Sequence, residues 1–449
     1  MSQQNKTTLQ SCINAQLADN STGNITAANV RNNLINITDS LLFNSGSQSI
    51  TGSLIVTGSL GVTGSISTSG SNGTINGLFF STGGGNVPSN ISIGATTNFS
   101  FSASGVGNTA IGYSALQFNT SGSHNTAIGN QALKDNILGS HNTAIGNQAL
   151  FYNTSGSYNT AIGRSALYYN TSGSFNTAIG CRALYRNTTG CYNTAIGCNS
   201  LQSNTTGINN VAIGPLALFY NTSGSHNTAI GNAALNKNTT GSFNTAIGNN
   251  ALTSNTSGSN NTAIGCNALQ NNIFGYNNTA IGNSALQCNS FGFNNTAIGN
   301  SALYRNTIGT YNTAIGRSAM QCNLAGTNNI AIGQCALVSS SIGSNNIAFG
   351  QCTGCFFSGS SSNNIAIGFG AGPSTNTEES SKLYIASGSG TPLIKGDFAA
   401  KTVNINNILQ LPVLTTTPSP AADGMIIASG SGGASKVYYY NGTSWNALF

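Results

Sequence analysis

Hydrophobic and polar residues alternate along this chain with a fixed period of 17 residues. The pattern Asn-Thr-Ala-Ile-Gly begins at Asn108 and returns every 17 residues up to Asn346, which gives fifteen units in strict register. Looser copies lie 18 residues outside them, at Asn90 and Asn364. A period this short is typical of a solenoid, in which each coil contacts only its neighbours.

Each position of the unit has its own chemistry, as Asn159–Phe175 shows. Counted from the first Asn, position 2 is Thr or another β-branched residue, position 4 is nearly always Ile, and positions 8 and 9 are mostly Ala and Leu. Positions 2 and 4 predict one face of a short strand, and we expect that face to point inward. Gly at position 5 and Asn-Thr-Ser-Gly at positions 12 to 15 predict turns. Each unit is therefore predicted as strand, turn, strand, turn.

Stacking of these units predicts an all-β fold, an elongated parallel β-solenoid or β-roll of about 17 coils with a 17-residue period. Each strand is expected to pair with its equivalent in the next coil, with Ile stacked on Ile and Leu on Leu. Asn at positions 1 and 12 of nearly every coil predicts ladders of side-chain amides that bond along the axis.

The segments on either side of the repeats differ from them in pattern. Apolar residues at helical spacing predict an amphipathic helix over Thr26–Phe43, and Thr-Gly-Ser repeats every six residues through 50–66. Neither segment buries enough apolar surface by itself, so both favour a parallel homotrimer. Asn441-Gly442 predicts a hairpin turn. The chain is thus divided into an N-terminal attachment region at 1–46, a hexad-repeat β segment at 47–89, the solenoid shaft at 90–372, a connecting β segment at 373–420 and a C-terminal β tip at 421–449.

Charged residues make up only 4% of the chain, against a usual value of about 25%. The net charge is +6, and the basic residues of the repeats are single charges spread over many coils. Nucleic-acid binding needs denser basic clusters interleaved with aromatic residues, so we expect a weak attraction to anionic cell-surface glycans instead. With no apolar window of about 18 residues and no recognisable leader, membrane insertion is not expected.

Candidate catalytic residues are sparse. Cleavage of a polysaccharide needs two carboxylates about 5 to 10 Å apart, and Asp135 is the only acid between 90 and 372. Glu378, Glu379, Asp397 and Asp423 lie outside that range without an accompanying His. We therefore predict that the chain is not an enzyme and uses no cofactor.

The histidines and cysteines were weighed as metal or redox sites. His124, His141 and His226 all fall at position 17, where three copies of a ladder could hold a metal, but Tyr, Phe or Asn fills this position elsewhere, so a surface ladder is predicted. Most cysteines share positions 6, 7, 10 and 11 with Lys and Arg, which indicates the solvent side. Cys181 with Cys198, and Cys335 with Cys352, are one coil apart, near enough for a bridge but with poor torsions, so free thiols are expected.

The repeat resembles a known family at Asn210–Gly214, where it reads Asn-Val-Ala-Ile-Gly. This pattern and its Thr versions look like the head repeats of trimeric autotransporter adhesins (YadA-like) over about residues 90–372, although their period is about 14 rather than 17 and their stalk and membrane barrel have no counterpart here. The hexads, the segment from Leu383 to Phe398 and the closing Tyr440–Trp445 resemble bacteriophage fibre proteins. In such fibres the N-terminal part commonly attaches to the virion and the distal part contacts the host.

These resemblances imply a structural fibre on the surface of a virion, assembled in the host cytoplasm and bound to a capsid or baseplate protein at its N-terminal region. Tyr438, Tyr439, Tyr440 and Trp445 are the predicted contacts with a host surface glycan or protein, because aromatic faces with polar edges suit recognition. The same rings could equally fill the core of a small trimeric cap. The alternatives are a cellular YadA-like surface adhesin and an ice-binding β-solenoid, the latter because Thr recurs at positions 2 and 13.

Overall fold

The computed structural model describes residues 72–75, 78–81, 90–94, 104–388, 391–406, 413–414, 426–429, 436–440 and 443–447. Within these residues the regular secondary structure is β-strand. The predicted helix at 26–43 and the hexads at 50–66 lie outside the described residues.

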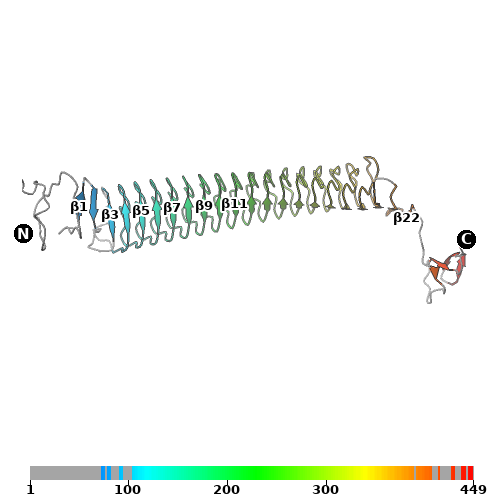
Figure 1. The fold of residues 1–449 in the computed structure, drawn as a ribbon, viewed down its shortest axis with the longest axis horizontal. Coiled ribbons are helices and arrows are strands. Elements are labelled where there is room, and N and C mark those ends of the chain that lie inside the picture. The colour runs from blue at the N-terminus through cyan, green and yellow to red at the C-terminus, as the bar shows by residue number, and fades with distance from the viewer. Residues whose placement is uncertain are drawn as a thin grey trace, which may run out of the picture. The chain divides into compact units, whose positions relative to one another are not determined.

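The repeats form a parallel β-solenoid of about 17 turns with a 17-residue period, as predicted (Figure 1). Every coil supplies one three-residue strand, which pairs in register with the equivalent strand of the next coil. Thr143 thus lies opposite Thr160, and Ile145 opposite Ile162. The strands are β3 (Ile91–Ile93), β4 (Thr109–Ile111), β5 (Thr126–Ile128), β6 (Thr143–Ile145), β7 (Thr160–Ile162), β8 (Thr177–Ile179), β9 (Thr194–Ile196), β10 (Val211–Ile213), β11 (Thr228–Ile230), β12 (Thr245–Ile247), β13 (Thr262–Ile264), β14 (Thr279–Ile281), β15 (Thr296–Ile298), β16 (Thr313–Ile315), β17 (Ile330–Ile332), β18 (Ile347–Phe349) and β19 (Ile365–Ile367).

The strand face that points inward carries Ala, so the prediction that Thr and Ile face inward is wrong. Ala178 in β8 is fully buried, whereas Thr177 is half-buried and Ile179 is 36% exposed. The interior of each coil must also hold Ala and Leu from positions 8 and 9, such as Ala183 and Leu184, and two Asn side chains. We infer that only a methyl group fits beside them at position 3. The predicted stacking of Leu on Leu inside the coils is confirmed.

The second predicted strand of each unit is absent from the described coils. Positions 7 and 9 adopt the left-handed backbone region, with φ of 56° at Arg182 and 51° at Leu184, and a strand requires negative φ. The segment is a series of turns instead. Its backbone still bonds between coils, since the Leu184 N–H donates to the Ser200 carbonyl at 3.0 Å and the Arg186 N–H to the Gln202 carbonyl at 2.9 Å.

Two buried ladders of Asn amides run along the axis, as predicted. At position 1, Asn142 Nδ2 donates to Asn125 Oδ1 at 3.1 Å and to the Gly156 carbonyl at 2.9 Å. At position 12, Asn153 Nδ2 donates to Asn136 Oδ1 at 2.7 Å and to the same Gly156 carbonyl at 2.8 Å. The carbonyl at position 15 thus joins the two ladders within each coil. The buried amides are paired with acceptors, which removes the cost of placing polar groups in the core.

Different strands cover the two ends of the ladder. Before β3, β1 (Asn72–Ile75) and β2 (Leu78–Ser81) pair antiparallel, and β2 pairs antiparallel with β3. After β19, β20 (Lys382–Ile385) continues the parallel ladder, and β21 (Ile394–Asp397) and β22 (Thr402–Ile405) follow it antiparallel. Tyr384 takes the register position of the inward Ala and is buried, with its ring 5.9 Å from that of Phe357. These two rings close the end of the core.

The C-terminal segment forms a separate four-stranded sheet of β23 (Val413–Leu414), β24 (Ile426–Ser429), β25 (Lys436–Tyr440) and β26 (Trp445–Ala447). Strands β25 and β26 pair antiparallel, with Tyr440 opposite Trp445. This is the pairing that the hairpin prediction requires. The turn residues Asn441 and Gly442 themselves lie outside the described residues.

Candidate binding surfaces

The outer face of the parallel ladder, here called the sheet face, is made of the side chains at positions 2 and 4. Thr and Ile stand side by side on each strand, and the more exposed residues at position 4 are 36–41% exposed. They are Ile145, Ile179, Ile196, Ile247, Ile281, Ile298, Ile332, Phe349 and Ile367. A continuous apolar row of this length is unusual on a monomeric soluble protein and marks an interaction surface.

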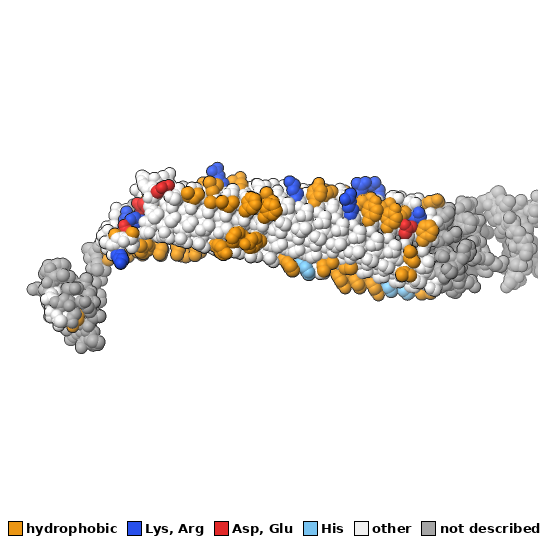
Figure 2. Space-filling view, turned by 180° about the vertical axis from the view of Figure 1, so that it is seen from behind, with side chains coloured by type: hydrophobic (Ala, Val, Ile, Leu, Met, Phe, Trp, Pro, Cys, Tyr) orange, Lys and Arg blue, Asp and Glu red, His pale blue; other side chains and the backbone are white. Residues whose placement is uncertain are grey.

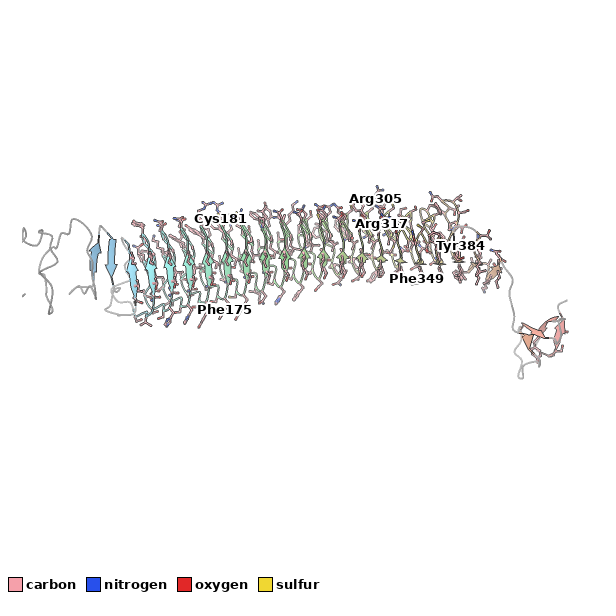
Figure 3. All side chains as sticks on the ribbon, in the orientation of Figure 1. Phe175, Cys181, Arg305, Arg317, Phe349 and Tyr384 are labelled. Carbon is pink, nitrogen blue, oxygen red and sulfur yellow. The ribbon has the colours of Figure 1, made fainter. Side chains whose placement is uncertain are left out.

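A second surface, here called the basic edge, is formed by positions 6, 7, 10 and 11. All seven Lys and Arg residues of the repeats lie on it: Lys134, Arg164, Arg182, Arg186, Lys237, Arg305 and Arg317. Figure 3 shows Cys181, Arg305 and Arg317 along one edge of the shaft and Phe175 on the opposite one. The single acid, Asp135, is next to Lys134; burial raises the pKa of its carboxyl, and Lys134 lowers it in part. The basic edge therefore presents positive charge with little to neutralise it.

Five aromatic rings gather on the basic edge, and we call them the tyrosine cluster: Phe151, Tyr152, Tyr168, Tyr169 and Tyr185. Tyr152 lies edge-on to Tyr168 at 5.2 Å between ring centroids, and Tyr169 meets Tyr168 in the same way at 4.7 Å. Burial, followed by the neighbouring Tyr152, raises the pKa of Tyr168 to about 12. The rings thus hold each other in a fixed arrangement.

Cations border the tyrosine cluster. Lys134 Nζ lies 5.1 Å from the centroid of Phe151, and the Arg182 guanidinium lies 5.7 Å from that of Tyr185. Figure 2 shows basic side chains along one edge of the shaft, with a group of hydrophobic side chains beside them. Sequence reasoning missed this cluster because it treated each position by its commonest residue. The signal was the run Phe-Tyr, Tyr-Tyr and Tyr-Arg at positions 10 and 11 of three successive coils.

Position 17 forms a ring ladder on another surface. His124, His141, Tyr158, Phe175 and Tyr192 stack in order, with centroids 4.7–5.0 Å apart. His226 is five coils beyond His141 and stacks on Phe243. The structure therefore brings together two of the three histidines. Over the residues that the structure describes, no group of three or more His, Cys, Asp or Glu side chains converges as a metal site would.

The described cysteines are free thiols at half-buried or exposed positions: Cys181, Cys191, Cys198, Cys266, Cys288, Cys322, Cys335, Cys352 and Cys355. Burial, together with neighbouring Cys335, raises the pKa of the Cys352 thiol. Burial likewise raises the pKa of the Cys355 thiol, with Cys352 adding to it. Thiols with raised pKa values are protonated at neutral pH and therefore poor nucleophiles and metal ligands. Cys12 lies outside the described residues.

The acids beyond the shaft take part in the end structure of the solenoid. Tyr384 donates its hydroxyl proton to Glu379, and Lys382 forms an ion pair with Asp397. The Lys382 hydrogen bond holds the pKa of Asp397 below its ordinary value. Glu378 accepts a hydrogen bond from the Ser360 N–H at 3.4 Å. Asp423 lies outside the described residues.

The predicted receptor residues occupy two paired strands of the C-terminal sheet. Tyr438, Tyr439 and Tyr440 belong to β25, and Trp445 begins β26. The register places Tyr440 directly opposite Trp445, and Tyr439 opposite Asn446. Elsewhere too, none of the described residues forms a helix long and apolar enough to span a membrane.

Comparison with known proteins adds no relative. No protein-family model, no curated protein and no solved structure matches the chain. The sheet face, the basic edge and the ring ladder therefore carry the functional argument by themselves.

Proposed function

We propose that this chain is a non-enzymatic structural fibre protein of a phage or phage-like particle and that it acts as a parallel homotrimer. Its N-terminal region would attach to a capsid or baseplate protein, and its distal part would contact a host surface. The single observation that carries the proposal is the sheet face, an uninterrupted row of exposed apolar side chains along a stiff stack of coils.

The sheet face supports self-association for a physical reason. Burying apolar surface contributes about 25 cal/mol per Å², and the row repeats the same chemistry on every strand from β4 to β19. Two further copies of the chain offer the same flat, regular surface. Three copies that pack these faces around a common axis would bury the Ile row and leave the basic edge available.

The construction of the shaft also supports a fibre. Seventeen stacked strands at about 4.8 Å each make a rod of roughly 80 Å. Its backbone hydrogen bonds and Asn ladders run parallel to the axis, so every coil is tied to the next by several bonds. A rod of this kind spans a distance rather than enclosing a ligand.

The experiment measures the mass of the full chain in solution by light scattering. A trimer is expected, and a double variant Ile179→Asp/Ile247→Asp should dissociate it while the circular dichroism of the coils is preserved. Matched substitutions on the ring ladder, Tyr158→Ser/Phe243→Ser, should leave the trimer intact. A monomeric wild-type chain would contradict the proposal, as would absence of the chain from purified particles of its source.

Ice binding is the second candidate, because the outward Thr residues form a regular row on the sheet face. The row is interrupted at Val211, Ile330, Ile347 and Ile365, which favours packing over matching to a lattice. Inhibition of ice recrystallisation by a monomeric chain would favour this candidate. A cellular YadA-like surface adhesin would instead be found attached to a cell envelope.

A further inference from the structure

We propose that the tyrosine cluster and the arginines beside it bind an acidic polysaccharide whose sugar rings carry carboxylate groups. This site is on the wall of the shaft and is distinct from the C-terminal tip. The inference deepens the proposed attachment role and rests on it.

The first argument is the coincidence of two independent features. The repeats contain seven cations over fifteen strict units, and four of them, Lys134, Arg164, Arg182 and Arg186, fall in four consecutive coils. The same coils hold the five rings of the tyrosine cluster. The only acid nearby is Asp135. Charge and aromatic surface are therefore concentrated at one place on an otherwise neutral, polar wall.

The second argument is the state of the side chains. Tyr152 is 38% and Tyr169 is 42% exposed, while their partners Phe151 and Tyr168 are more buried and support them from below. Arg182 and Arg186 are exposed on the same edge. Rigid rings lose little entropy on binding, and Tyr and Arg are the side chains that most often dominate binding energy. The cluster is thus organised before a ligand arrives.

The third argument selects the ligand. Arginine recognises carboxylate through paired N–H donors, and tyrosine offers an apolar ring with a polar hydroxyl. A polysaccharide of uronic acids provides both complements, carboxylates for the arginines and C–H surfaces with hydroxyl groups for the rings. A linear polymer also suits a surface that is repetitive along the axis. A phosphate polymer without sugar rings would satisfy only the cations, and double-stranded DNA would do the same.

The test measures binding of the full chain to polygalacturonate, with dextran, poly(glycerol phosphate) and double-stranded DNA as comparison ligands. Wild type should bind polygalacturonate and not dextran, with an affinity that falls as salt rises. Tyr152→Ser/Tyr169→Ser and Arg182→Gln/Arg186→Gln should each weaken binding at least about tenfold, as expected for central contacts. If the tyrosine variant does not fold by circular dichroism, the arginine variant decides the question.

Matched controls separate a specific site from general charge. Tyr158→Ser/Tyr192→Ser removes exposed stacked rings from the ring ladder, and Arg305→Gln/Arg317→Gln removes the same charge from distant coils; both should bind within about twofold of wild type. Equal losses in the two arginine variants would overturn the site, as would wild-type chain that ignores polygalacturonate or prefers DNA or poly(glycerol phosphate). A trimer that does not bind sinks only this inference, whereas a binding monomer sinks only the fibre.

Discussion

Ala178 and Ile179 are neighbours in one strand, yet Ala178 is fully buried and Ile179 is 36% exposed. The same relationship holds in strand after strand, so the smaller apolar residue builds the core and the larger one builds the surface. This inversion underlies both the correction to the inward face and the proposal that chains associate through the sheet face.

The inversion predicts opposite results for two adjacent substitutions. Ala178→Asp should place an unpaired charge in the core, costing several kcal/mol and disrupting its coil. Ile179→Asp should leave the circular dichroism of the shaft unchanged and alter only the solution mass. Comparable loss of structure in both variants would mean that Ile179 is also part of the core.

The Asn ladders predict a large cost for a small deletion of atoms. Asn221 Nδ2 donates to Asn204 Oδ1 at 2.8 Å and to the Gly224 carbonyl at 2.9 Å, and Asn221 Oδ1 accepts from Asn238 at 2.8 Å. Each buried partner left unpaired costs about 1–3 kcal/mol. Asn221→Ala should therefore lower the free energy of unfolding by about 3 kcal/mol or more, whereas exposed Asn249→Ala should change it by less than about 0.5 kcal/mol. Chemical denaturation checks both values, and similar values for the two would argue against the ladders.

The glycine at position 15 predicts a steric limit between coils. A Cβ atom on Gly224 would lie 2.4 Å from the Gly241 carbonyl oxygen and 2.5 Å from Asn221 Oδ1. Gly224→Ala should destabilise the shaft by about 1–3 kcal/mol through overpacking. Gly388→Ala is the control, because a Cβ there meets nothing within 4 Å. A thermal melt of Gly224→Ala that matches wild type would show that the coils can spread apart.

The register predicts which deletions are tolerated. Removal of one whole unit, residues 227–243, should leave a folded shaft one coil shorter, because Val211 in β10 would then pair with Thr245 in β12. Removal of only residues 227–234 would place turn residues opposite strands and leave core Asn side chains without partners. Circular dichroism and limited proteolysis compare the two, and equal tolerance would be incompatible with a stacked register.

The buried tyrosine hydroxyls predict a loss of stability in strong alkali. Burial raises the pKa of Tyr168 from its ordinary 10.0 to about 12. Burial and the bond to Glu379 raise that of Tyr384 as well. The native state keeps these protons while the unfolded chain releases them, so stability is complete below pH 10 and falls as the pH rises from 10 to 12. Tyr168→Phe should flatten the fall in melts recorded across this window, and an unchanged slope would exclude Tyr168 as its cause.

The sequence by itself determined the repeat, its register and the two Asn ladders. A 17-residue period leaves each strand no partner but its own equivalent, and Asn at fixed positions in every coil can satisfy its amide only along the axis. Leu at position 9 was also correctly placed inside, because no other position offers a large apolar residue so regularly between turns.

The tertiary structure alone decided which strand face is buried, where the second strand fails and where the tyrosine cluster forms. Alternation along a strand defines two faces but does not say which one is inside; the narrow interior of a closed 17-residue coil does, and it admits Ala178 rather than Ile179. Left-handed backbone at Leu184 is imposed by closing that coil, against the preference of Leu. Tyr152 and Tyr169 are one coil apart in sequence, and only stacking brings their rings to 5.5 Å beside the arginines.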